Sequence, residues 1–166
     1  MGLDLDHDVP RCGLPGPRPE NSGQVADTPT RRVGWTGRRV PAHCTASGRA
    51  LLFDHDLDSL AEVLGADPLP AAGPRAPRTP AELHDRIVAA RASGWATVDE
   101  EFEEGLVAVA APVRGMRGHV VAAVNVSAPR FRFGGAVDRA GPAIKNVADR
   151  LSGRLGTALS DLSAST

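Results

Sequence analysis

The sequence predicts an α/β domain in which helices pack against an antiparallel sheet. Two short apolar runs, residues 106–113 and 119–127, flank the glycine-containing segment 114–118, which is the usual signal of a β-hairpin. After the hairpin, from about Gly141, apolar residues recur at the spacing of an amphipathic helix. They are Ile144, Val147, Ala148, Leu151, Leu155 and Leu159.

Composition limits the class of protein. The chain has 166 residues, of which 42% are hydrophobic and 23% are charged, as expected for one globular domain. The formal net charge of −1 gives no electrostatic reason to expect nucleic-acid binding. Cys12 and Cys44 fit neither a disulfide framework nor a paired metal motif. With no signal-peptide pattern and no apolar run long enough to cross a bilayer, we expect a cytoplasmic protein and no membrane partner.

The N-terminal segment differs from the rest of the chain. Residues 1–27 contain four prolines and no helical or strand period, so they are predicted to be irregular or disordered. Residues 31–35 are a candidate strand within an arginine-rich stretch that is expected to be a solvated face. The folded domain is expected over residues 28–160, whether or not its N-terminal edge is complete, and residues 161–166 are expected to fray.

Local signals place the helices and the first strand. Thr45 and Ser47 are both candidate N-caps of a helix that follows them. A second helix is predicted over residues 56–64, with Gly65 as its stop. The capping box at residues 79–82 opens a third helix that points Leu83, Ile87 and Ala90 inward and ends near Gly94. Residues 95–98 are predicted to be a strand and residues 130–135 a loop.

The hairpin has two unlike faces, because side chains alternate along a strand. One face is branched and apolar: it holds Val107, Val109, Ala111 and Val113 of the first strand with Val120, Ala122, Val124 and Val126 of the second. The other face is small and then polar: it holds Leu106, Ala108 and Ala110 with Val121, Ala123, Asn125 and Ser127. The first face suits packing under helices. Polar residues at the end of the second face are typical of an open sheet surface or of a ligand site.

Three groups of residues could carry chemistry, and each has a simpler interpretation. Cys44 follows His43 just before a helix, which would favour a reactive thiol, but buried inert cysteine is the commoner case and no further metal ligands are nearby. The acidic residues of segment 99–104 could bind a cation, but a solvated loop with Phe102 turned to the core is the simpler interpretation. No nucleotide-binding or hydrolase motif is present. We expect no catalytic residues, no metal and no cofactor.

Several blocks of sequence together resemble a known family. PTRRV at residues 29–33, PAHCTASGRALL at 41–52, ARASGWATVDEE at 90–101 and EFEEGLVAVAAPVR with VVAAVNVS in the hairpin region occur in order and at matching spacing. They are similar to the effector-binding domain of the IclR family of bacterial transcriptional regulators, and most of all to its aromatic-acid and β-ketoadipate branch. The resemblance runs from about Thr28 to about Gly156.

The resemblance implies a fold and a site. The expected fold is GAF/profilin-like, a curved antiparallel sheet with helices packed on one face and an effector cavity on the other. Carried over position by position, the effector-binding residues are Ala46, Ser47, Leu106, Ala108, Asn125 and Ser127. Relatives often have serine where Asn125 stands, which keeps a hydrogen-bond partner for an acid but changes its reach. For these residues to share one face, Ala108 is predicted opposite Asn125 and Leu106 opposite Ser127, with an even number of residues in the hairpin loop.

The function implied is the sensing of a small organic acid, aromatic or dicarboxylic, without chemistry. Full-length relatives carry a winged helix-turn-helix domain upstream, which is not recognised here, so no direct DNA binding by this chain is expected. Homo-oligomers or pairing with full-length family members remain open as partners. The alternatives are a non-functional truncated remnant of such a regulator and, more distantly, an enzyme that uses Cys44.

Overall fold

The computed structural model describes residues 40–65 and 67–163. The predicted irregular segment 1–27 and the candidate strand at 31–35 lie outside the described residues, as do residues 164–166. In chain order the elements are α1 (Ala46–Leu51), α2 (Leu57–Leu64), α3 (Pro80–Ser93), β1 (Ala96–Asp99), β2 (Leu106–Arg114), β3 (Val120–Pro129), α4 (Arg130–Phe133), the short 3-10 helix η1 (Gly134–Ala136) and α5 (Val137–Ser163).

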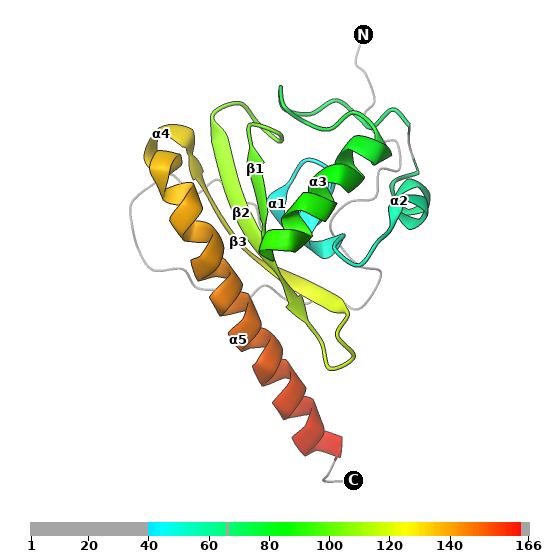
Figure 1. Cartoon of the computed structure of the whole chain (residues 1–166), viewed down its shortest axis with the longest axis vertical. Helices are drawn as coiled ribbons and strands as arrows, with labels where there is room; N and C mark the ends of the chain where they lie inside the picture. Colours follow the sequence, from blue (N-terminus) through cyan, green and yellow to red (C-terminus); the bar gives the residue numbers. More distant parts are fainter. Residues whose placement is uncertain (1–39, 66, 164–166) are drawn as a thin grey trace.

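The strands form an antiparallel sheet of order β1-β2-β3 that is covered on both faces. On one face α5 runs diagonally across the strands, where Ile144 and Ala148 cluster with Ala111 and Val113. On the other face α1 lies directly on the sheet, and α2 and α3 pack beside it (Figure 1). The α/β class with an antiparallel sheet is confirmed, and the described structure adds helices on the second face.

The helix boundaries follow the predicted caps. Thr45, not Ser47, caps α1: its hydroxyl accepts a hydrogen bond from the Gly48 N–H. Asp56 caps α2 in the same way, and Thr79 caps α3 with proline at the first helical position. Both α2 and α3 end at a glycine in the left-handed region, Gly65 and Gly94, where a side chain would be strained. These ends match the predicted ones to within one residue.

The hairpin loop differs from the prediction. The Gly115 N–H donates to the His119 carbonyl, which leaves three residues in the loop rather than an even number. Gly118 occupies the left-handed region that such a three-residue loop requires. A β-bulge follows, because Arg114 pairs with Val120 but Val113 pairs with Ala122, so that β3 has one extra residue at this point. The extra residue restores the alternation of side chains between the two faces of the sheet. The bulge also sends Val120 to the α2–α3 side, where it packs against that core, and not to the α5 side as predicted.

Two boundaries near the C-terminus were also predicted wrongly. Residues 130–135, expected to be a loop, form α4 and the start of η1. Helices this short carry no complete period of apolar residues, so the sequence pattern does not reveal them. The last helix begins at Val137 rather than near Gly141, and Pro142 lies inside it. Pro142 resembles a helix start because proline is favoured in the first turn.

Candidate functional site

The residues predicted to bind an effector lie on the α1 side of the sheet. Ala108 is paired with Ser127, Ala110 with Asn125, and Leu106 with Pro129. The register is therefore shifted by two residues from the predicted pairing of Ala108 with Asn125. A shift of two keeps every side chain on its face, so the strand residues of the predicted site still share one side of the sheet. A loop with an odd number of residues would by itself place Ala108 and Asn125 on opposite faces, but the bulge compensates for it.

Helix α1 covers part of this face of the sheet. Ala46 and Ala50 are buried against Ala108, Ala110 and Val98 in one cluster. Small side chains on both sides let the helix approach the strands closely. Gly48 shows how close the chain passes on the other side of α1, since an added Cβ would lie 2.3 Å from the Ala42 carbonyl oxygen. The position of α1 over the sheet thus depends on alanine and glycine at these sites.

The polar residues of the predicted site lie where α1 no longer covers the strand. Asn125 and Ser127 are exposed, Ser47 is half-buried and Ala46 is buried. The structure brings Ala46 and Ala108 into contact in one cluster, with Ser127 opposite Ala108 across the strands. No contact joins Ser47 to Asn125 or Ser127 among the interactions described. The arrangement is an alanine floor bordered by two hydrogen-bonding side chains.

A buried ion cluster, which sequence analysis missed, lies under α1. Arg49 is 3% exposed, and its Nη1 and Nη2 both donate hydrogen bonds to the Glu101 carboxylate, with Nη1 3.2 Å from Oε1. Arg49 Nη1 also donates to the Thr97 carbonyl at 2.9 Å, and Arg86 Nη1 lies 2.7 Å from Glu101 Oε2. Glu101 was expected in a solvated loop, but it is 6% exposed because two arginines neutralise it. The cluster ties α1, α3, β1 and the acidic segment together.

Two further acidic residues, Asp99 and Glu100, contact arginines nearer the surface. Arg75 Nη1 lies 2.6 Å from Asp99 Oδ2, and Arg130 Nη1 lies 2.8 Å from Glu100 Oε2. Glu100 has a φ of 57°, so its backbone is held in the left-handed region. Gly73 lies against this turn, where an added Cβ would be 2.4 Å from the Glu100 carbonyl oxygen. The acidic segment is therefore a folded turn fixed by arginines, not a cation site.

Cys44 and His43 are both completely buried. The Cys44 thiol points to the Pro41 carbonyl at 3.7 Å, and His43 Nε2 lies 3.2 Å from the Pro70 carbonyl. Burial is the main cause that lowers the pKa of His43 below its ordinary value of 6.5; the Pro70 carbonyl opposes this, and the Arg49 charge adds to it. A buried thiol beside a neutral imidazole that hydrogen-bonds elsewhere supports the structural interpretation of this pair.

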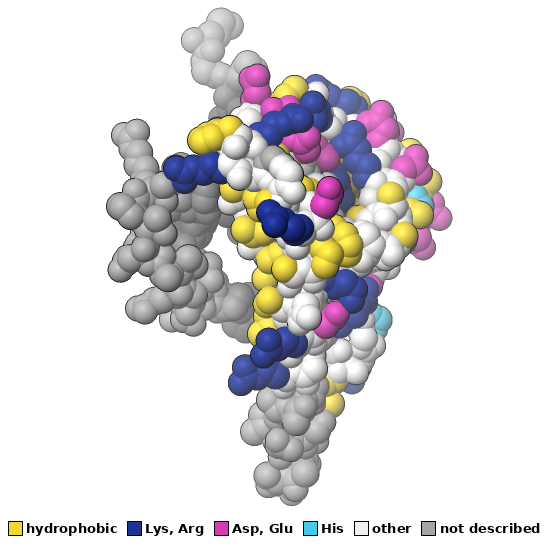
Figure 2. All heavy atoms as spheres, turned by 60° about the vertical axis from the view of Figure 1, so that its left-hand side comes forward, with side chains coloured by type: hydrophobic (Ala, Val, Ile, Leu, Met, Phe, Trp, Pro, Cys, Tyr) yellow, Lys and Arg dark blue, Asp and Glu magenta, His cyan; other side chains and the backbone are white. Residues whose placement is uncertain are grey.

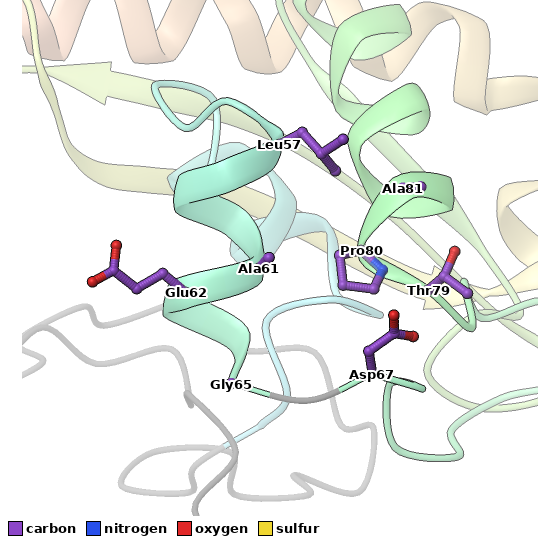
Figure 3. A pocket seen from close by; sticks show the side chains of 8 residues that line it. All are labelled: Leu57, Ala61, Glu62, Gly65, Asp67, Thr79, Pro80 and Ala81. Atoms are coloured by element: carbon purple, nitrogen blue, oxygen red, sulfur yellow. The ribbon is translucent and has the colours of Figure 1, made fainter.

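A surface hollow lies between α2 and α3, away from the predicted site. It has a volume of about 570 Å³ and is lined by residues of both helices and of the segment that joins them (Figure 3): Leu57, Ala61, Glu62, Gly65, Asp67, Thr79, Pro80 and Ala81. None of the six predicted effector residues lines it. Its wall holds two carboxylates, Glu62 and Asp67, and no cationic side chain. An organic anion would be repelled there.

Neither a metal site nor a membrane-spanning helix is present among residues 40–65 and 67–163. No group of three or more His, Cys, Asp or Glu side chains in this part of the chain could hold a metal ion. No helix in the same residues is both long and apolar enough to cross a membrane.

Known proteins share both the sequence and the fold. Residues 24–153 match the family described as bacterial transcriptional regulator IclR C-terminal. The Pca regulon regulatory protein of Pseudomonas putida is 45% identical over 91 residues, which cover 55% of this chain and 31% of that protein. The chain thus spans about a third of the length of the curated relatives it matches.

Solved structures agree with the sequence match. The repressor BlcR of Agobacterium tumefaciens superposes with a TM-score of 0.67 at 27% identity, over 72% of this chain and 49% of that one. A double mutant of the PobR inducer-binding domain from Acinetobacter, in complex with 3-hydroxybenzoic acid, superposes with a TM-score of 0.66 at 28% identity, over 76% and 74% of the two chains. With the family matched over most of the described fold, this chain belongs to the IclR C-terminal family of bacterial transcriptional regulators, and its relatives include regulators of aromatic catabolism.

Proposed function

We propose that this domain senses a small organic acid, aromatic or dicarboxylic, that binds on the α1 side of β2 and β3. The effector site consists of Ala46, Ser47, Leu106, Ala108, Asn125 and Ser127. The observation that carries the proposal is the pair of exposed polar side chains, Asn125 and Ser127, on one face of an otherwise apolar strand. A strand face that ends in hydrogen-bonding groups beside small residues can hold a planar or short acid.

The chemistry of the residues fits recognition without reaction. The Asn125 amide and the Ser127 hydroxyl both donate hydrogen bonds, so they can hold the carboxylate or a ring hydroxyl of the ligand. Ala46 and Ala108 form an apolar border beside these polar groups. No titratable group belongs to the six residues, and the Cys44 thiol is fully buried. The PobR domain that binds 3-hydroxybenzoic acid supports an aromatic acid as the ligand class.

A thermal-shift series tests the site. The probes are 3-hydroxybenzoate, benzoate, succinate and adipate, with the corresponding amides as uncharged controls. A ligand that binds only the folded state must raise the melting temperature. We expect at least one acid to do so, and Ser127→Ala or Asn125→Ala to weaken its binding about tenfold, since each removes one hydrogen bond to a charged group.

A matched variant distinguishes this site from the hollow between α2 and α3. Ala81→Leu fills that hollow from the exposed start of α3. We expect Ala81→Leu to bind the acid as the unchanged protein does. If Ala81→Leu abolishes the thermal shift while Ser127→Ala preserves it, the ligand site is the hollow and the proposal is wrong.

A further inference from the structure

The segment that leads into α1, residues 41–45, is anchored to the rest of the fold by buried contacts. His43 is fully buried, and its Nε2 lies 3.2 Å from the Pro70 carbonyl oxygen, in the segment between α2 and α3. One residue earlier, the Ala42 backbone lies so close to Gly48 of α1 that no Cβ fits between them. A displacement of His43 and its neighbours therefore also displaces α1.

The hydrogen bond to Pro70 determines the protonation state of the His43 ring. A carbonyl oxygen only accepts hydrogen bonds, so Nε2 carries the proton and Nδ1 of the neutral ring has a lone pair. Nδ1 is buried and has no hydrogen-bond partner among the described residues. A second proton would create a buried N–H without an acceptor, as well as a buried charge, and both cost free energy.

The charged groups around His43 do not compensate for a second positive charge. Arg49 of α1 repels the imidazolium and Glu101 attracts it, but the Glu101 carboxylate already binds Arg49 and Arg86. Figure 2 shows arginine and acidic side chains together at the surface, whereas His43, Arg49 and Glu101 are buried and little screened. The pKa of His43 lies below its ordinary value of 6.5, chiefly because of burial; the Pro70 carbonyl and Glu101 oppose the shift, and Arg49 adds to it.

We propose that His43 is an acid-sensitive latch that holds α1 on the sheet. When Nδ1 takes up a proton, the ring leaves its buried position, and residues 41–45 and α1 move away from the strands. At neutral pH the latch is closed, because the neutral ring fits the buried position. Helix α1 carries Ala46 and Ser47, so the latch also controls the effector site; this step rests on the proposed function, whereas the release of α1 does not.

The pKa values of the closed and open forms predict the size of the effect. In the open form His43 takes up a proton with the ordinary pKa of 6.5, whereas in the closed form it does so at a lower pH. The closed form is therefore fully favoured above about pH 6.5, and its advantage falls as the pH drops toward the pKa of the closed form. Between about pH 7.5 and about pH 5.5 the equilibrium constant for opening should rise severalfold, by up to about tenfold.

Thiol labelling of Cys44 measures the opening, since Cys44 adjoins His43 and is fully buried in the closed form. The full chain is used with Cys12→Ser, so that Cys44 is its only thiol. A disulfide reagent is added at these two pH values without effector. Each rate is divided by that of the urea-unfolded chain at the same pH, which removes the intrinsic pH dependence of the thiol. We expect the normalised rate to rise severalfold in acid, and an unchanged rate would overturn the proposal.

His43→Gln removes the titrating group but keeps an N–H donor for the Pro70 carbonyl. Its normalised rate is expected to be the same at both pH values, and a rise equal to that of the parent would contradict the latch. His119→Gln is the matched control: His119 is exposed beside the hairpin loop, and this variant should keep the full rise. If His43→Gln does not fold, an NMR titration of the His43 ring in the parent decides, because a pKa at or above 6.5 in the folded protein contradicts the latch.

Two comparisons separate the latch from global unfolding and from the proposed function. In acid, the opening constant from labelling should exceed the unfolding constant from urea denaturation. Equal constants would mean that the whole domain unfolds, which overturns the latch. Any acid that binds in the thermal-shift series should slow the labelling of Cys44, because it binds the closed form. Labelling that rises in acid but is not slowed by such a ligand would support the latch and contradict the effector site.

Discussion

At the scale of single residues, Glu101 determines how the acidic segment folds. Five acidic residues occur between positions 99 and 104, and the sequence does not distinguish them. Only Glu101 is buried, because Arg49 and Arg86 reach it from α1 and α3. These arginines are 52 and 15 residues away in the chain, so the pairing could not be inferred from local pattern. The prediction that the segment is solvated was wrong for this one carboxylate.

Removing the Glu101 carboxylate should strongly destabilise the domain. In Glu101→Ala the Arg49 guanidinium stays buried without its counter-charge, which costs about 3 kcal/mol or more of the free energy of unfolding. Urea denaturation of both proteins measures this difference. Glu104→Ala is the matched control, since Glu104 is exposed in the same segment, and it should change stability by no more than about 0.5 kcal/mol. A small effect of Glu101→Ala would show that the buried pair contributes little.

At the scale of elements, the caps were predictable and the hairpin was only partly so. Thr79 with Pro80, and the stops at Gly65 and Gly94, act within a few residues, so the sequence contains all the information needed. The face of Asn125 was predicted correctly although the loop was not. The odd loop and the bulge each shift the alternation by one, and the two shifts cancel. A bulge depends on contacts made elsewhere in the fold, which local pattern does not contain.

One such contact comes from Asp54, in the segment that follows α1. Its carboxylate accepts a hydrogen bond from the Val120 N–H at 2.7 Å, next to the bulge, and from Arg114 at 2.8 Å. Burial alone would raise the pKa of Asp54. The hydrogen bonds from the Val120 N–H and the Arg114 guanidinium lower it by a larger amount, so the pKa lies below its ordinary value of 3.8. Ionised Asp54 therefore stabilises the hairpin.

The stability contributed by Asp54 should depend on pH. Because its folded-state pKa is depressed, the contribution is fully present above about pH 3.8 and is lost as the pH falls through the folded-state value. Asp54→Asn should lower the free energy of unfolding by about 1 kcal/mol at neutral pH, a figure already reduced for the partial exposure of the side chain. The difference from the unchanged protein should shrink below pH 3.8.

Melting curves from pH 7 to pH 3 measure this difference between the two proteins. Asp85→Asn, on the exposed side of α3, should track the unchanged protein at every pH. A constant difference between Asp54→Asn and the unchanged protein down to the lowest pH would show that the carboxylate charge is not responsible.

At the scale of the whole molecule, α5 is the element that covers the face of the sheet opposite α1. The apolar spacing of its residues predicted the helix correctly but not where it crosses the strands. That crossing occurs at Gly141, where an added Cβ would lie 2.2 Å from the Trp95 ring. The sequence shows a glycine within a helix, which by itself indicates only a cost in helix stability. Contact with a ring 46 residues earlier in the chain explains why the glycine is needed.

Two glycines of α5 should therefore respond oppositely to the same substitution. Gly141→Ala forces Trp95 or the helix to move, and overpacking of this kind costs about 1–3 kcal/mol. At Gly153 an added Cβ meets nothing within 4 Å, so Gly153→Ala should gain helix propensity and stabilise the protein by about 0.5–1 kcal/mol. Chemical denaturation of the two variants, followed by tryptophan fluorescence, measures both changes. If both variants are stabilised, α5 is not seated on Trp95; if both are destabilised, the C-terminal half of α5 makes contacts that the crossing at Gly141 does not explain.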